Sequence, residues 1–337
     1  MRWTDVSDLM QAVVLPEALR KEEAGYCPAV WQAGSVAIED ACAWARSKRS
    51  ELIDQARVHG AVLFRGLPVT EPEHFDAFLS AFGLANFPYE ESLSNAVRVN
   101  FTPRVFSANE APSDVRIFLH HEMAQTPIYP EKLFFCCLQS AESGGATPIC
   151  RSDWLVDRIR VELAGFYADC KVKGLRYSNV MPSDDDPESG MGRSWRSTLR
   201  AETVEAAEER LRSMAYDWTW LDGVCLRATT PVLPAIKQLP DGRETFFNQL
   251  IAAFCGWSDE RNDPSNAITF GDGTALPKET VLRVGELAEE VTFDLAWQDG
   301  DIAMVDNQVA MHGRRTFAGK RRVLASLAEA RDNRFVA

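Results

Sequence analysis

The stretch Val115-Arg-Ile-Phe-Leu-His-His-Glu-Met123 combines an apolar strand pattern with two histidines and a carboxylate near its end. Residues two apart on a strand point to the same face, so His120 and Glu122 are expected to converge while His121 points away. An imidazole and a carboxylate side by side supply two of the three protein ligands of a facial metal site. The stretch therefore predicts a metal centre at the end of a β-strand.

The third ligand has to come from elsewhere, and the chain contains only five histidines. His312 is the best candidate, because it lies in the segment Asp306-Asn-Gln-Val-Ala-Met-His-Gly-Arg-Arg315 between two late strand patterns. Two histidines and one carboxylate with open coordination positions suit non-haem Fe(II) and its oxygen chemistry. We therefore predict that His120, Glu122 and His312 are the metal-binding and catalytic residues.

Strand patterns recur on both sides of this centre. They cover residues 59–67, 132–138, 147–150, 218–229, 244–249, 291–304 and 321–327, whereas helical spacing covers 41–57, 73–82 and 202–218. This order predicts a mainly β fold with flanking helices, a double-stranded β-helix (jelly-roll) core with a helical insert. We expect a single domain over residues 1–337, with an irregular N-terminal arm over 1–40 and an insert or lid region over 151–217.

The composition of the 337-residue chain is that of a globular protein, with 46% hydrophobic and 25% charged residues. The net charge of −13 disfavours phosphate contacts, so no nucleic acid and no anionic membrane is expected as a partner. No apolar run approaches the roughly 20 residues of a membrane span, and no secretory pattern opens the sequence. We expect a cytoplasmic protein whose eight cysteines, which form no CxxC pair, are buried free thiols.

Two further motifs suggest an anchor for a dicarboxylate co-substrate. Gly144-Gly-Ala-Thr147 follows the first histidine, and Gly319-Lys-Arg-Arg-Val-Leu324 follows His312. Arginine grips a carboxylate with a bidentate fork, and a threonine hydroxyl adds a hydrogen bond. We therefore predict that Arg322 and Thr147 bind the co-substrate. The alternative is that Arg322 is one surface arginine of a basic cluster.

Taken together, these motifs resemble the Fe(II)/2-oxoglutarate dioxygenases of the taurine dioxygenase (TauD/TfdA) superfamily, and most closely its clavaminate synthase-like branch. The resemblance extends from about residue 55 to the C-terminus. Its fragments are Phe106-Ser-Ala-Asn-Glu110, His120-His-Glu-Met-Ala-Gln125, Lys132-Leu-Phe-Phe135, Gly192-Arg-Ser-Trp195, Phe247-Asn-Gln249, Gly256-Trp257, Arg261-Asn-Asp-Pro264 and Arg322-Val-Leu-Ala-Ser326.

The resemblance implies that His120, Glu122 and His312 ligate Fe(II), with 2-oxoglutarate and O₂ as co-substrates. It implies that 2-oxoglutarate is held by Arg322 and Thr147 and leaves as succinate and CO₂. Related halogenases have a small residue in place of the carboxylate ligand, so hydroxylation, desaturation or cyclisation is expected here. Relatives such as taurine dioxygenase carry a second arginine where this chain has Ser326, and Arg314 is the candidate to replace it.

The substrate is expected to be a small molecule, an amino acid or an amino-acid derivative, free or tethered to a carrier. The polar loop 181–195 is suited to act as a lid, although its acidic residues could equally be a solvated face. Candidate substrate-binding residues near the motifs are Asn109, Gln125, Arg193, Asn248 and Arg314.

Two other functions remain open from the residues alone, a zinc-dependent hydrolase and a non-catalytic metal-binding jelly roll. Neither gives Thr147 and Arg322 a role, and the chain has no HExxH motif. The sequence leaves the oligomeric state unknown.

Overall fold

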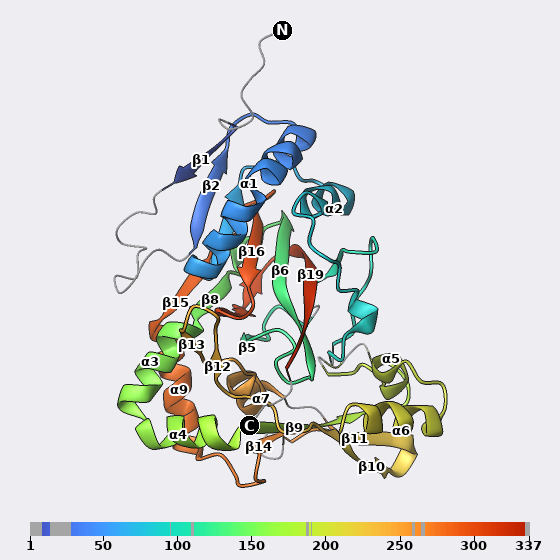
Figure 1. The fold of residues 1–337 in the computed structure, drawn as a ribbon. Coiled ribbons are helices and arrows are strands. Elements are labelled where there is room, and N and C mark those ends of the chain that lie inside the picture. Colours follow the sequence, from blue (N-terminus) through green and yellow to red (C-terminus); the bar gives the residue numbers. More distant parts are fainter. Residues whose placement is uncertain are drawn as a thin grey trace.

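The computed structural model describes residues 9–13, 28–94, 96–108, 111–186, 189, 191–257, 260–263 and 267–333. Its centre consists of two sheets (Figure 1). The larger has the strand order β1 (Met10–Val13), β2 (Ala29–Ala33), β3 (Ala61–Arg65), β16 (Ile302–Asp306), β6 (Ile128–Gln139), β19 (Arg322–Asp332) and β4 (Phe106–Ser107). The smaller has the order β15 (Thr292–Leu295), β8 (Thr147–Arg151), β17 (Ala310–Arg314) and β5 (Ile117–His120). All pairings in these sheets are antiparallel except that of β2 with β3.

The two sheets face each other across a shared apolar core. Leu63, Leu133 and Val305 from the larger sheet pack in one cluster with Ile149 and Leu295 from the smaller sheet. Strand β6 is buried on both faces, since Leu133 lies in this cluster while its neighbour Phe134 lies in a second cluster under the helices. This double burial explains the continuous apolar run over 132–138. Two facing antiparallel sheets confirm the predicted jelly-roll core.

Helices cover the outer face of the larger sheet. The predicted helices over 41–57 and 73–82 are α1 (Ile38–His59) and α2 (Pro72–Ser80). Trp44 of α1 and Phe78 of α2 are fully buried against Phe64 of β3, with ring centroids 6.2 and 5.2 Å from that of Phe64. This aromatic layer fixes the helices on the sheet.

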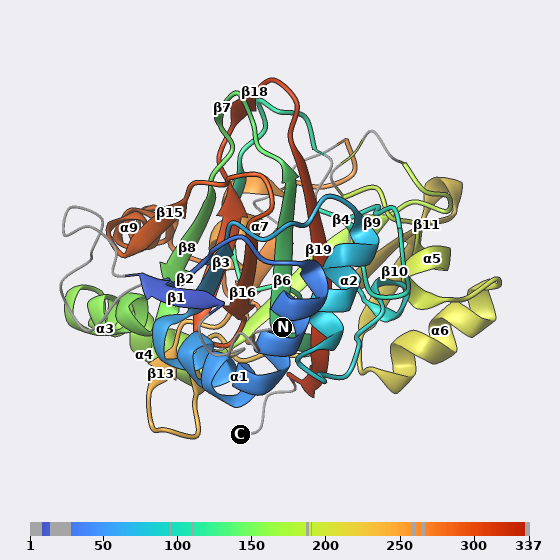
Figure 2. The ribbon, with the colours of Figure 1, turned by 90° about the horizontal axis from the view of Figure 1, so that it is seen from above.

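Two groups of elements flank the core on opposite sides (Figures 1 and 2). One group contains α3 (Ser152–Glu162), α4 (Ala164–Lys173) and α9 (Lys278–Glu290); the other contains α5 (Trp195–Leu199), α6 (Val204–Ser213), β10 (Asp217–Leu221) and β11 (Cys225–Thr229). Strand β9 (Leu175–Met181) pairs with β11 and with β14 (Ile268–Phe270) in a third sheet, beside α7 (Leu250–Gly256). The remaining short elements are η3 (Tyr89–Glu91), β7 (Ser143–Gly144), η4 (Asp222–Val224), β12 (Lys237–Gln238), β13 (Glu244–Thr245) and β18 (Phe317–Ala318).

Several boundaries differ from the sequence prediction. The described part of the N-terminal arm is not irregular, because β1 and β2 extend the larger sheet. The helix expected over 202–218 ends at Ser213, and Ala215 follows in the left-handed conformation. The strand expected over 244–249 ends at Thr245, since the next residues turn into α7.

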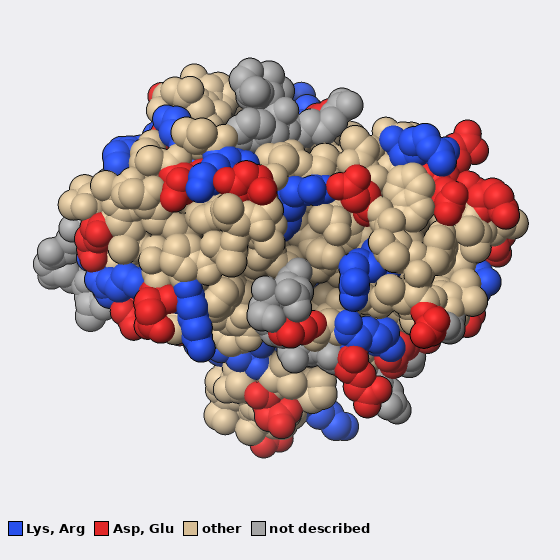
Figure 3. Space-filling view, turned by 90° about the horizontal axis from the view of Figure 1, so that it is seen from below, with Lys and Arg blue, Asp and Glu red and all other residues tan. Residues whose placement is uncertain are grey.

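The seven cysteines in the described part of the chain are free, as predicted, and five of them are buried. No helix in the described ranges is long and apolar enough to span a membrane. Acidic and basic side chains lie interspersed over the face shown in Figure 3, so neither sign of charge forms a continuous patch in this view.

Candidate metal centre and its cavity

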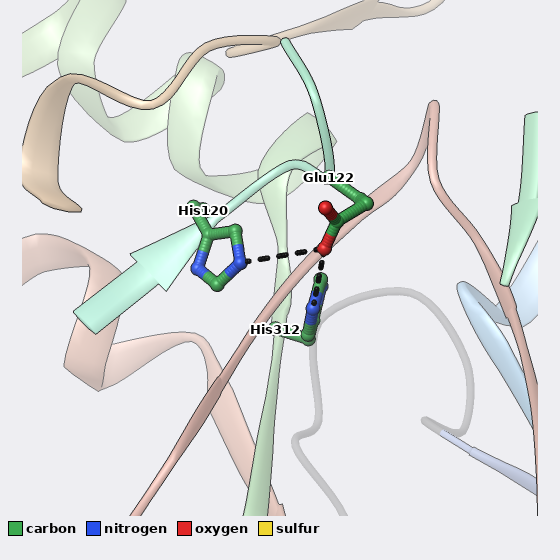
Figure 4. Close-up of side chains that lie close together, drawn as sticks. All are labelled: His120, Glu122 and His312. Carbon is green, nitrogen blue, oxygen red and sulfur yellow. Dashed lines mark ion pairs between the residues drawn. The ribbon is translucent and has the colours of Figure 1, made fainter. Parts of the chain in front are cut away.

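His120, Glu122 and His312 converge on one point (Figure 4). The Glu122 Oε2 atom lies 3.8 Å from the His120 Nε2 atom and 3.6 Å from the His312 Nε2 atom. A metal ion binds such atoms at roughly 2.1 Å, so one ion fits between them after small side-chain shifts. The three side chains are 14%, 14% and 8% exposed, which leaves the site sheltered but open on one side. The residues predicted to bind metal are thus brought together.

The two histidines are placed by strand pairing. His120 and His312 are directly opposite each other on β5 and β17. Gly313 permits this close approach, because a Cβ atom at this position would lie 2.5 Å from the Ile117 carbonyl oxygen. The His120 Nδ1 atom lies 2.7 Å from the Phe118 carbonyl oxygen, which favours a proton on Nδ1 and leaves the Nε2 lone pair for a metal.

Glu122 does not lie on the strand, which ends at His120. It lies in a turn that is held by Asn307, a fully buried residue between β16 and β17. The Glu122 backbone N–H donates to Asn307 Oδ1 at 2.8 Å, and Asn307 Nδ2 donates to the Glu122 carbonyl oxygen at 2.9 Å. Met123 follows with a φ of 57°, a left-handed conformation that a methionine rarely adopts. The turn, rather than strand alternation, therefore directs the carboxylate.

His121 points away from the centre, as expected. It is fully buried, with its ring centroid 4.7 Å from that of Phe247, and its Nδ1 atom contacts the Asn307 carbonyl oxygen. Burial is the main reason that the pKa of His121 is lowered to about 3. His121 is thus a neutral packing residue that faces Asn307.

The electrostatics of the three converging side chains suit a cation. Burial alone raises the pKa of Glu122, but its hydrogen bond to His120 and the charges of His120, His312 and Arg98 outweigh burial and lower the pKa to about 2. Burial and the neighbouring His120 hold the pKa of His312 well below its usual range. At neutral pH the centre therefore presents a carboxylate and a neutral His312, which is the protonation state that binds a metal.

The three residues line a cavity of about 660 Å³, a size typical of small-molecule sites. Thr147, buried at the start of β8, also lines this cavity. Its Oγ1 atom accepts a hydrogen bond of 2.9 Å from the Trp297 indole. Asp186, Ser189 and Met191 bring the described part of the predicted lid loop to the cavity wall.

Arg322 does not line the cavity, so the predicted orientation of this side chain is wrong. Side chains alternate along β19: Val323 lines the cavity and Leu324 packs in the cluster under the helices, so Arg322 points outward and Arg321 inward. Arg322 is exposed, with its guanidinium 5.5 Å from the ring centroid of Phe101.

Arg321 lines the cavity instead, and its Nε atom donates to the Gly145 carbonyl oxygen at 3.0 Å. Burial and the nearby Arg314 lower the pKa of Arg321 to about 10, so it remains a cation at neutral pH. A half-buried cation beside another cation is well placed to receive an anion.

The predicted substrate residues divide into two groups. Gln125 and Arg314 line the cavity. The Arg314 guanidinium is hydrogen-bonded to the backbone, since it donates to the carbonyl oxygens of Ala111, Pro112 and Val115 at 2.6–2.7 Å.

Arg193 and Asn248 do not line the cavity, which corrects their predicted role. Arg193 is buried against the segment that contains Ser92, and it donates to the Ser92 carbonyl oxygen at 2.8 Å. Asn248 donates to the Ala235 carbonyl oxygen and accepts from the Leu250 backbone, both at 2.9 Å. Both side chains have structural partners in place of a ligand. Asn109 lies outside the described residues.

Asn307 and Arg98 are two site residues that the sequence did not predict. Asn307 lay within the quoted segment around His312, but only tertiary structure brings it to Glu122. Arg98 follows η3 in an irregular segment that belongs to none of the quoted motifs, and it lines the cavity.

Comparisons with known proteins agree with this architecture. Residues 23–327 match the family model described as taurine catabolism dioxygenase TauD, TfdA family. A clavaminate synthase-like protein of Arabidopsis thaliana is 40% identical over 271 residues, which cover 80% of this chain and 82% of the relative. The dapdiamide synthesis protein DdaC of Enterobacter agglomerans is 28% identical over 285 residues, with the same coverage of 80% and 82%.

A solved taurine dioxygenase from Burkholderia xenovorans has the same fold, with a TM-score of 0.52 and 14% identity over 95% of this chain and 89% of that one. The family match decides between the dioxygenase and the two other functions that the residues had left open. The chain therefore belongs to the TauD/TfdA family of non-haem iron, 2-oxoglutarate-dependent dioxygenases.

Proposed function

We propose that this dioxygenase oxidises an unactivated C–H bond of an amino acid or a close derivative, with His120, Glu122 and His312 as its iron ligands. The observation that supports the ligand set most strongly is the convergence of the three side chains, with 3.6 and 3.8 Å between their ligand atoms, at the wall of a cavity. Fe(II) bound there keeps open positions and supplies the oxygen chemistry. In the overall reaction one oxygen atom of O₂ enters succinate, the other enters the product or water, and CO₂ leaves.

The protein's own contribution is to bind and orient the two organic substrates. Arg321 receives the distal carboxylate of 2-oxoglutarate, because it is the half-buried cavity arginine that contacts Gly145, two residues before Thr147 in the same motif. The Thr147 hydroxyl accepts from Trp297 and so has its own hydrogen left to donate to that carboxylate. This assignment moves the anchor by one residue from the Arg322 of the sequence prediction.

The chemistry of the cavity supports an amino-acid-like substrate. Beside the apolar side chains of Phe135 and Leu133, the cavity presents the polar groups of Gln125, Ser326 and Arg98. A lipid or a steroid would need a broad apolar wall, whereas a small polar acid or amide can satisfy these groups. The names of the two relatives, one clavaminate synthase-like and one for dapdiamide synthesis, agree with such a substrate.

The test is coupled succinate release with Fe(II), O₂ and 2-oxoglutarate in the presence of a panel of amino acids, their amides and carrier-bound forms. At least one member of the panel should stimulate succinate release and gain or lose mass accordingly by mass spectrometry. The E122A variant serves as the control and should release no succinate above background. Stimulation by an apolar fatty acid alone, with none by any amino-acid compound, would contradict the proposed substrate class.

A further inference from the structure

Arg98 differs from every other arginine of the cavity in having no bound counterpart among the described residues. It lines the cavity, and its Nε and Nη1 atoms are buried without a hydrogen-bond partner. Its guanidinium lies over the ring of Tyr89, 5.7 Å from the ring centroid. Two buried guanidinium nitrogens without hydrogen bonds are costly, so the site favours a ligand that accepts them.

The other arginines of the cavity each have an ion pair or a hydrogen bond within the protein. Arg116 pairs with Glu289, and Arg261 pairs with Asp186 at 2.8 Å. Arg314 donates to three backbone carbonyl oxygens, and Arg321 donates to that of Gly145. Each of these side chains holds part of the cavity wall in place. Arg98 holds no such part, so its charge is available to a ligand.

The position of Arg98 relates it to the metal centre. Arg98, Glu122 and His312 line the same cavity, so a ligand held by Arg98 lies in the cavity to which the metal site opens. Ser326 lines the same cavity and offers only a hydroxyl. Gln125 lines it as well, and its buried Oε1 atom has no hydrogen-bond partner among the described residues. The cavity therefore contains one unused cation and one unused amide.

We infer that Arg98 binds a free carboxylate of the substrate and thereby holds the substrate beside the metal, while Gln125 accepts a hydrogen bond from a donor group of the same molecule. This inference rests on the proposed function and narrows it to substrates with a carboxylate. The planar guanidinium matches a carboxylate with two parallel hydrogen bonds. A compound tethered to a carrier through its only carboxyl group cannot make this contact, so the free acid is the substrate.

The experiment uses the full-length enzyme with Fe(II) and 2-oxoglutarate under anaerobic conditions. L-Amino acids and their matched primary amides are titrated in, and binding is followed by the change in the visible absorption band of the Fe(II)–2-oxoglutarate complex. Wild-type enzyme should bind at least one acid more than about tenfold more tightly than its amide. The R98Q variant should lose this preference, and R98K should keep part of it because lysine retains the charge without the fork.

The R116Q variant is the matched control, since it removes an arginine from the same cavity whose charge Glu289 already balances. R116Q should retain the preference for the acid. Equal binding of acids and amides by wild-type enzyme, or an unchanged preference in R98Q, would overturn the inference. The inference would also be overturned if wild-type enzyme showed the Fe(II)–2-oxoglutarate band but bound none of the acids. It would be overturned as well if R98Q lost as much affinity for 2-oxoglutarate as R321Q. Absence of the band from wild-type enzyme would overturn the proposed function itself, and the inference with it.

Discussion

His120 and His312 face each other across the pair of strands β5 and β17, with their ring centroids 4.3 Å apart. The two rings are fixed by the backbone ladder of the smaller sheet, whereas Glu122 is fixed by the side chain of Asn307. The metal centre thus depends on two different supports, a strand register and a buried amide. Each support can be disturbed separately.

Removal of any of the three proposed metal ligands should abolish Fe(II) binding without unfolding the protein. H120A, E122A and H312A should each fail to retain Fe(II) in equilibrium dialysis and should show no turnover, while the far-ultraviolet circular dichroism stays that of wild type. H121A is the control, because His121 points away and packs on Phe247. It should retain Fe(II) binding but unfold at a lower temperature. An inactive H121A beside an active H120A would reverse the assignment of the two histidines.

Asn307 should act as a positioning residue. The N307A variant loses the hydrogen bonds to Glu122 and the bond of 2.7 Å to the Pro130 carbonyl oxygen. Buried backbone groups would then lack partners, so the free energy of unfolding should fall by about 2–4 kcal/mol. The Fe(II) affinity measured at a temperature where the variant is folded should fall as well. An unchanged affinity in folded N307A would show that the turn orients Glu122 without this amide.

The co-substrate anchor should follow the side chain that lines the cavity. Loss of a charged partner costs about 2–5 kcal/mol, so R321Q should raise the apparent KM for 2-oxoglutarate by well over tenfold. T147A should raise it by less. R322Q removes the same charge one residue away, from an exposed position, and should leave this KM within a factor of about two. The opposite result, with R322Q impaired and R321Q normal, would restore the original sequence prediction.

Glu244 should make the protein sensitive to acid. Burial raises the pKa of Glu244, but hydrogen bonds from Lys171, Tyr167 and Arg160 outweigh it and lower the pKa to about 2. A carboxylate with a lowered pKa stabilises the fold above its unfolded value of about 4.5, and this contribution is lost as the pH falls towards 2.

The E244Q variant should therefore be less stable than wild type at pH 7, by about 1–2 kcal/mol after allowance for partial exposure. The difference should shrink as the pH falls from 5 to about 2 in urea unfolding curves. A difference that stays constant with pH would show that Glu244 acts through packing and not through its charge.

The sequence was sufficient where local pattern determines structure. The apolar run over 132–138 has to be buried on both faces, so a core strand could be predicted there. His120 and Glu122 were correctly expected to converge, although the turn held by Asn307 and not strand alternation directs Glu122. His312 could be predicted as the third ligand because the chain has only five histidines. The jelly-roll core followed from the number and order of strand patterns.

The sequence failed where a residue's role depends on distant partners. The position of β19 in the sheet decides which of Arg321 and Arg322 faces the cavity, and no feature of the Arg-Arg pair reveals it. Arg193 and Asn248 were predicted to bind a ligand because they are polar and lie near motifs. In the structure their side chains donate hydrogen bonds to backbone carbonyl oxygens elsewhere in the chain. Arg98 lies in an irregular segment, and only the folded chain brings it into the cavity.

The central claim is an iron and 2-oxoglutarate centre built on His120, Glu122 and His312, and the most direct measurement is the anaerobic visible spectrum. Addition of Fe(II) and then 2-oxoglutarate to wild-type protein should produce a metal-to-ligand absorption band that saturates with 2-oxoglutarate. The band should be absent with Zn(II) and absent from H312A. Absence of the band from wild-type protein, or an undiminished band in H312A, would contradict the account.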